Sequence, residues 1–197
     1  MSTTPARLLA TVAAVDLLRR LVARNGSLMM HQSGGCCDGS SPMCFLDGEF
    51  LVGDRDVLVG VLDLRLDAGE TRPDPPSGSY AVPVWISGSQ FEAWKHTCLV
   101  LDVVPGRGAG FSLESPEVVR FLSRGRAFTG EEIAALASSG VVLGRDWADG
   151  ARPGASPAPL VVSDAGDACP VPQRSTTDTR GGAEALAGEV DPPASAW

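Results

Sequence analysis

Hydrophobic positions near the start of the chain recur at helical spacing and then change to strand-like patterns. Between Pro5 and Arg24 the apolar residues lie three or four positions apart, and Asn25-Gly26 follows as a left-handed stop. This pattern predicts an amphipathic N-terminal helix. The next residues, Ser27 to Gln32, have the composition of a short strand.

Strand-like stretches dominate the middle of the chain. Residues 56–66 show the alternation of a half-buried strand, and residues 98–104 are strongly apolar, with the glycine-rich PGRGAG segment turning them into a hairpin. Two capping-box patterns, Ser89 with Glu92 and Thr129 with Glu132, predict helix starts. The predicted fold class is α+β, with the N-terminal helix packed on a mostly antiparallel or mixed β-sheet. Strands are predicted at 49–52, 56–66, 82–86, 98–104 and 111–114.

Two segments lack periodicity. Residues 67–79 are polar and rich in proline, which indicates an exposed loop. From about residue 145 small residues, proline and acidic residues dominate. We therefore predict one globular domain over residues 1–144 and a disordered acidic C-terminal tail over residues 145–197.

Charge and length narrow the class of protein. A chain of 197 residues has room for one core of ordinary size, and a net charge of −8 without a basic stripe argues against a nucleic-acid partner. The apolar runs are shorter than the roughly 20 residues that cross a bilayer, and no signal-peptide pattern is present. The expected location is the cytoplasm, with no membrane partner.

One short stretch gathers most of the metal-capable side chains. It contains His31, Cys36, Cys37, Asp38 and Cys44 within fourteen residues, on a backbone rich in glycine. Thiolate and imidazole ligands suit zinc, iron or an iron–sulfur cluster, and glycines allow the tight bends that bring neighbouring side chains together. The stretch predicts a metal site with His31, Cys36, Cys37 and Cys44 as candidate ligands and Asp38 as a weaker one.

The spacing of these cysteines leaves other interpretations open. There is no C-x2-C pair, and vicinal cysteines point in different directions in an extended chain, so one of Cys36 and Cys37 is the expected ligand. Cys44 and His31 would join it if the two ends of the loop lie side by side. A redox-active thiol pair and a purely structural loop are the alternatives. His96 and Cys98 would share one face of a strand and are weaker candidates.

Several long runs carry a family resemblance. The segments HQSGGCCDGSSPMC, GDRDVLVG, SQFEAWKHT and LDVVPGRGAGFSLE, with RFLSR after them, resemble the bacterial family called domain of unknown function 779, over about residues 8–130. Members are often encoded beside aldehyde dehydrogenases, so the resemblance implies an accessory role in aldehyde or alcohol oxidation, with an aldehyde dehydrogenase as partner. It implies no catalytic activity. The proline-rich stretch 67–79 and the tail are longer than the family pattern, and Cys98 departs from it.

A weaker similarity concerns the order of elements. A helix, a strand, a Gly-Gly-Cys loop and further strands around a short helix are similar to the A-type iron–sulfur carrier (HesB-like) pattern, although the C-x-C pair of that family is absent. The leading hypothesis is a small metal-binding accessory protein. The alternatives are a thiol-dependent or metal-assisted enzyme acting on aldehydes, and a metal-free module docking on the dehydrogenase. A homodimer with a site shared across subunits stays open.

Overall fold

The fold is built from two β-sheets with a long helix between them. A computed structural model of the chain describes residues 4–34, 41–108 and 110–168. Among them the order of strands is β7-β6-β1-β9 in the first sheet and β3-β2-β5-β4-β8 in the second. The predicted α+β class is confirmed, although the strands form two sheets and not one. The strands are β1 (Leu8–Thr11), β2 (Leu28–Gln32), β3 (Met43–Leu46), β4 (Val57–Asp63), β5 (Ala81–Ile86), β6 (Thr97–Pro105), β7 (Val119–Ala127), β8 (Val142–Leu143) and β9 (Val161–Val162).

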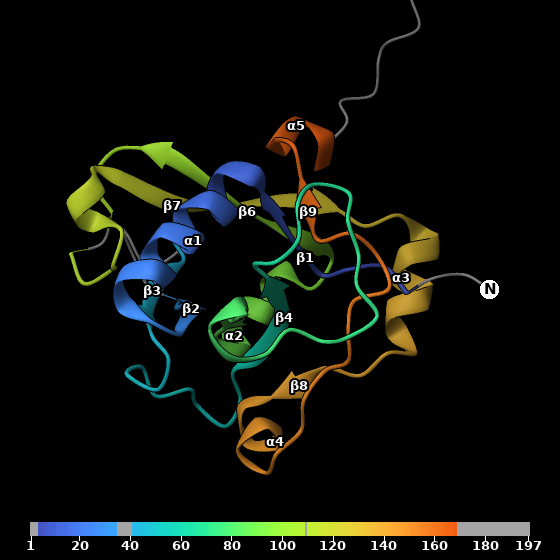
Figure 1. Cartoon of the computed structure of the whole chain (residues 1–197). Helices are drawn as coiled ribbons and strands as arrows, with labels where there is room; N and C mark the ends of the chain where they lie inside the picture. The colour runs from blue at the N-terminus through green and yellow to red at the C-terminus, as the bar shows by residue number, and fades with distance from the viewer. Residues whose placement is uncertain (1–3, 35–40, 109, 169–197) are drawn as a thin grey trace, which may run out of the picture.

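Helices flank and separate these sheets. In Figure 1, α1 lies between β6 and β7 above it and β2 and β3 below it, and it contacts both sheets. None of the helices in the described residues has the length and apolar character needed to cross a bilayer. The helices are α1 (Val12–Asn25), α2 (Gly88–Trp94), α3 (Gly130–Ala137), α4 (Gly144–Ala148) and α5 (Ala165–Ala168), with short 3-10 turns η1 (Gly78–Tyr80) and η2 (Ser115–Glu117).

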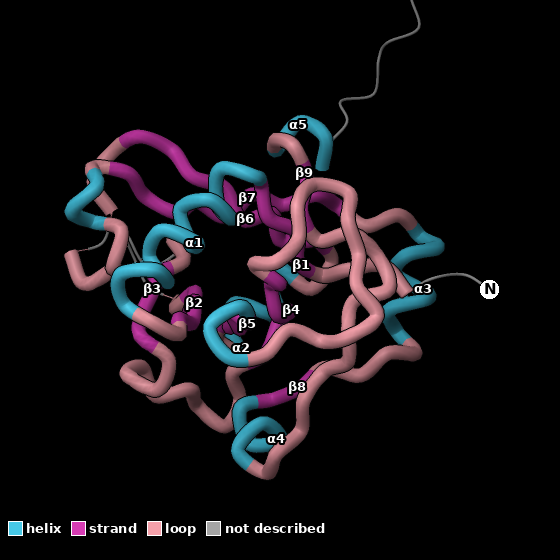
Figure 2. Tube along the Cα trace, in the orientation of Figure 1, coloured by secondary structure: helices cyan, strands magenta, loops and turns pink. Residues whose placement is uncertain are grey.

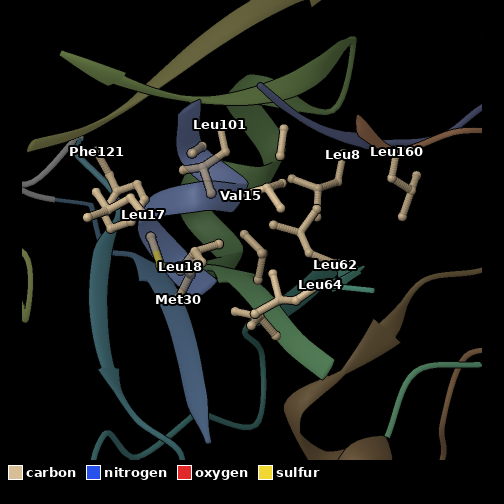
Figure 3. Packing of buried hydrophobic residues seen from close by; sticks show 14 of the residues in the cluster. Leu8, Val15, Leu17, Leu18, Met30, Leu62, Leu64, Leu101, Phe121 and Leu160 are labelled. Atoms are coloured by element: carbon tan, nitrogen blue, oxygen red, sulfur yellow. The ribbon is translucent and has the colours of Figure 1, made fainter. Parts of the chain in front are cut away.

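The main core joins the two sheets through the apolar face of α1. Figure 3 shows Leu17 against Phe121 of the first sheet and Leu18 above Met30 of the second. All four side chains are fully buried. Each such side chain contributes about 1.5–3 kcal/mol when it leaves water, so this face of α1 ties the two sheets into one domain.

The start of the predicted N-terminal helix is corrected by the structure. Residues 8–11 form strand β1, which pairs in parallel with β6, and α1 begins only after Thr11, whose side chain accepts a hydrogen bond from the Ala14 N–H. Leu8 and Ala10 are fully buried, and helical spacing does not distinguish a buried strand that runs directly into a helix. The predicted stop is confirmed, because Gly26 has φ of 86° and its N–H donates to the carbonyl of Val22.

Other predicted elements differ in detail. Residues 49–52 and 111–114 are not strands; the antiparallel partner of β6 is β7, and the pair extends over the whole of both strands. Helix α2 starts at Gly88 without a side-chain cap, so the Ser89–Glu92 capping box is wrong, whereas the Thr129–Glu132 capping box of α3 is present.

The predicted disordered tail needs a larger correction. Residues 145–168 contain α4 and α5, and β9 extends the first sheet by pairing in parallel with β1. Leu160 and Val161 are buried in the main core. Isolated apolar residues in a proline-rich segment can therefore still anchor it, and the folded part reaches at least residue 168. Residues 169–197 lie outside the described part of the chain.

Candidate functional site

The candidate metal-binding stretch connects two neighbouring strands. It leaves β2 after Gln32 and enters β3 at Met43, and these strands pair antiparallel, with His31 opposite Met43 and Met30 opposite Cys44. The expectation that the two ends of the loop lie side by side is met. Cys36, Cys37 and Asp38, however, lie outside the described residues.

The register separates His31 from Cys44. Directly opposed residues of an antiparallel pair share a face, and successive residues alternate between faces. Cys44 therefore points with Met30 into the main core, where it is fully buried, while His31 points to the opposite face of the sheet. These two side chains cannot bind the same ion in this fold.

Two residues hold the His31 ring in one orientation. Asp56, which precedes β4, lies with Oδ2 3.0 Å from His31 Nε2, and Ser33 Oγ lies 2.9 Å from Nδ1. Phe50 packs on the ring with centroids 4.4 Å apart. The His31 side chain is only 4% exposed, so water competes weakly for these contacts.

These contacts assign a tautomer to His31. An ionised carboxylate only accepts hydrogen bonds, so Nε2 carries the proton that it donates to Asp56. In the neutral ring Nδ1 is then the acceptor, and the Ser33 hydroxyl donates to it. Asp56 is itself fixed, because its Oδ2 accepts from the Gly53 N–H at 2.8 Å. The lone pair of His31 Nδ1 therefore faces Ser33, the first residue of the cysteine-bearing loop, and accepts its hydroxyl hydrogen bond.

Polar groups also surround the start of this loop. Gln32 is fully buried and joins the two sheets, because it donates to Gln90 at 3.0 Å and accepts from Ser123 of β7 at 2.5 Å. Gly34 lies so close to α2 that an added Cβ would be 3.1 Å from Gln90 Cγ and 3.5 Å from Ser87 Oγ. At Gly34 the start of the loop therefore packs closely against polar side chains at the beginning of α2.

Cys44 has the surroundings of a packing residue. Its N–H donates to Ser112 Oγ at 2.8 Å, and the Ser112 hydroxyl donates to the carboxylate of Glu114. Burial, and then the nearby Glu114 carboxylate, raise the pKa of the Cys44 thiol. A thiol that stays protonated is a poor metal ligand and a poor nucleophile.

His96 and Cys98 do not come together. His96 is exposed, in the turn before β6, while Cys98 is fully buried in a cluster with Phe128 and Leu136. The predicted shared strand face fails because β6 begins only at Thr97. Across residues 4–34, 41–108 and 110–168, no three His, Cys, Asp or Glu side chains are placed to hold a metal ion.

The two residues that position His31, Asp56 and Ser33, were not predicted from the sequence. Asp56 is 25 positions away and directly precedes β4, and Ser33 is one of several serines in the loop. Both lie inside the runs HQSGGCCDGSSPMC and GDRDVLVG that carried the family resemblance. The presence of both residues in these runs was the signal that could have indicated a shared site. Local patterns do not reveal that β2 and β4 both pair with β5, which brings the two residues together.

Comparison with known proteins agrees with the resemblance. The family model described as Domain of unknown function (DUF779) matches residues 17–127, more than half of the chain. No curated protein and no solved structure matches. The similarity to A-type iron–sulfur carriers therefore has no support from solved structures.

Proposed function

The chain belongs to the DUF779 family, and we propose that it is a small cytoplasmic metal-binding accessory protein that serves an aldehyde dehydrogenase in aldehyde or alcohol oxidation. The metal is iron, zinc or an iron–sulfur cluster. The proposed ligands are His31 and a thiol of Cys36 or Cys37, with Asp38 as an additional donor. Cys44 is left out because its side chain lies on the other face of the sheet.

The observation that carries this proposal is the pairing of His31 with Asp56. Histidines that bind metals usually donate their second ring N–H to a carboxylate or carbonyl, which fixes the tautomer and makes the ligand more basic. His31 has this arrangement, with Nε2 held by Asp56 and Nδ1 directed to Ser33 at the start of the loop. An ion bound there would replace the Ser33 hydroxyl at Nδ1.

The link to an aldehyde dehydrogenase has a different basis. It rests on the family resemblance and on no contact in the structure. Co-purification of the dehydrogenase with this chain, and its loss of activity in cells that lack the chain, would support the link. A dehydrogenase that keeps full activity without this chain would contradict it.

Elemental analysis with an absorption spectrum tests the metal proposal. The protein should be purified without oxygen and without a His tag. We expect near-stoichiometric iron or zinc, and visible absorption with acid-labile sulfide if the group is a cluster. The double variant Cys36→Ser/Cys37→Ser should lose the metal, whereas Cys169→Ser, a cysteine far from the loop in sequence, should keep it. Equal metal content in the double variant and the control would overturn the proposal.

A second function is favoured by the same histidine. A carboxylate-oriented imidazole is also the kind of base that activates a thiol nucleophile, and Cys36 and Cys37 follow His31 closely in the sequence. In this function His31 is the base and Asp56 its orienting group. The chain would then be a thiol enzyme acting on aldehydes. We expect one cysteine to react rapidly with iodoacetamide at neutral pH, to be protected by an aldehyde, and to slow in His31→Gln. Metal-free protein with this reactivity would favour the enzyme over the metal carrier.

A further inference from the structure

A large cavity lies away from His31, between two loops and the second sheet. Its volume is about 710 Å³, within the usual range for small-molecule sites. Its walls come from the proline-rich loop 72–78, from the segment 152–160 and from β4 and β5. Figures 1 and 2 show the two loops running beside each other on the α3 side of β4.

Part of this cavity lies outside the family match. The match ends at residue 127, so the wall formed by residues 152–160 is supplied by a segment beyond it. Leu160, at the end of this wall, is buried beside Leu8 in the main core, and its carbonyl accepts from the Ala10 N–H at 2.8 Å. The cavity therefore depends on the folding of residues 152–160 against the main core.

The proline-rich wall is held in place by one arginine. Arg65 donates to both Asp63 oxygens, at 2.8 and 2.6 Å, and to Asp74 at 2.6 Å. The Gly69 N–H, shortly before this loop, donates to the carbonyl of Val161 at 3.1 Å, so the chain that leads into the loop is tied to β9, which follows the opposite wall. Prolines on both walls further restrict the backbone, so little ordering is required when a ligand binds.

The lining is largely apolar, and among the described residues two of its arginines, Arg7 and Arg152, have no carboxylate partner. Arg7 donates to the Leu136 carbonyl at 3.4 Å, and its guanidinium lies 5.7 Å from the centroid of the Phe91 ring, which leaves Arg152 as the candidate anion ligand. Val61, Pro83 and Leu66 contribute hydrocarbon surface, while Asp63 and Asp74 are already paired with Arg65. Arg152 also lines the cavity, and its guanidinium lies 3.7 Å from the centroid of the Trp147 ring.

Arg152 has unused donors. Its Nη1 donates to the carbonyls of Trp147 and Ala151, at 2.8 and 2.7 Å, and among the described residues no carboxylate pairs with it. The remaining N–H groups of Arg152 can bind an anion. The contact with the Trp147 ring limits rotation of the planar guanidinium, whose paired donors match the two oxygens of a carboxylate.

From this geometry we propose that the cavity binds a small amphipathic carboxylate, with the apolar body between the proline-rich loop and residues 152–160 and the carboxylate on Arg152. A single negative charge suits the site better than a phosphate dianion, because Asp63 and Asp74 also line it. Asp47 lines the cavity as well, so a cationic amphiphile is the competing ligand that the test must include.

Calorimetric titration with three probes of equal chain length tests this proposal. Decanoate, decanol and decylamine, each below its micelle concentration, should be compared on the full chain. We expect saturable 1:1 binding of decanoate, and binding of the other two at least about tenfold weaker, as loss of a charge-assisted contact implies. Equal or tighter binding of decanol or decylamine, or no saturable binding of decanoate, would overturn the proposal.

Two variants and their controls locate the site. Arg152→Ala should weaken decanoate about tenfold, while Arg145→Ala, an exposed arginine that does not line the cavity, should leave affinity unchanged. Ala155→Trp should fill the cavity and abolish binding, whereas Ala148→Trp, at an exposed position of α4 that does not line the cavity, should not. Far-UV circular dichroism verifies that each variant is folded. Unchanged affinity in folded Arg152→Ala or Ala155→Trp would contradict the proposed site.

Discussion

Met30 and His31 are consecutive in β2, yet their surroundings have opposite chemistry. Met30 points into the core between the sheets, beside Cys44 and the apolar face of α1. His31 points to the other side, where its two ring nitrogens are held by Asp56 and Ser33 and its face packs on Phe50. The inner face therefore serves stability, whereas the outer face fixes the orientation of the candidate ligand His31.

The difference shows that a β-sheet can separate candidate ligands that lie close together in the sequence. Five metal-capable side chains lie within fourteen residues, but alternation along β2 and β3 sends the two that the structure describes, His31 and Cys44, to opposite faces. Closeness along the chain is thus insufficient to define a ligand set. The register decides which side chains can meet.

The largest expected effect is on the inner face. Met30→Ala removes a fully buried side chain from the main core, and such truncations cost about 2–5 kcal/mol of unfolding free energy. Urea unfolding measures this loss, and Leu51→Ala, at a side chain that is 89% exposed, is the control with little expected change. Metal content per folded molecule should be unaltered. A loss of metal in folded Met30→Ala would break the division between the two faces.

A second effect is expected on the outer face. Asp56→Ala removes the partner of His31 Nε2, and loss of such a partner typically lowers metal affinity about 10–100-fold. Competition with a chromophoric chelator measures the affinity, and Asp56→Asn, which keeps an acceptor oxygen but not the charge, should fall between the variant and the wild type. Asp63→Ala, a carboxylate paired with Arg65 away from His31, is the control. Equal affinities in all four proteins would remove Asp56 from the site.

A third expected effect is a pH dependence of the unfolding free energy that originates on the inner face. Burial raises the pKa of Glu114, which lies on the inner side next to Cys44, although hydrogen bonds from Ser112 and the backbone oppose the shift. The folded state then keeps a proton that the unfolded state has released. This stabilisation is fully present below the ordinary pKa of 4.5 and is lost as pH rises through the folded pKa.

Glu114→Gln removes this dependence. Relative to the wild type, its free energy of unfolding should increase between pH 4 and pH 7, by less than the two effects above. Asp102→Asn provides the control of opposite sign: burial alone would raise the pKa of Asp102, but hydrogen bonds from Arg124, Val103 and Thr11 lower it. The stabilisation from Asp102 is present above its ordinary pKa of 3.8 and is lost as pH falls through the lowered folded pKa, so the stability of Asp102→Asn relative to the wild type should decrease as pH rises from about 2 to about 5. A parallel trend in both variants would contradict this assignment.

How far the sequence predicts these features depends on whether the signal is local. The stop of α1 at Gly26, the capping box of α3 and the strand nature of β2, β4, β5 and β6 follow from turn chemistry and alternation, and the structure confirms them. The pairing of β9 with β1 depends on Leu160 and Val161 meeting a strand about 150 positions earlier. Local composition carries no information on such a contact, which is why the segment was predicted to be disordered.

In the candidate site, too, the local features were predictable from the sequence and the long-range contacts were not. His31 was identified from its type and its place beside the cysteines, because both are local. Its partner Asp56 reaches it only because β5 lies between β2 and β4 in the second sheet, which brings the start of β4 to the end of β2. The candidate histidine could therefore be predicted from local sequence, whereas the carboxylate that orients it could not.

The smallest predicted effect concerns the hydroxyl at His31 Nδ1. If an ion binds this nitrogen, it displaces the hydrogen bond from Ser33, whose net value is about 0.5–1.5 kcal/mol. Ser33→Ala removes that competitor, so metal affinity should rise by a few-fold while unfolding free energy of the metal-free protein falls slightly. The same chelator competition measures the change, and Ser89→Ala, near the loop but not bonded to His31, is the control. A lowered affinity in Ser33→Ala would instead make Ser33 part of the ligand set, since the hydroxyl would then support the ion and not compete with it.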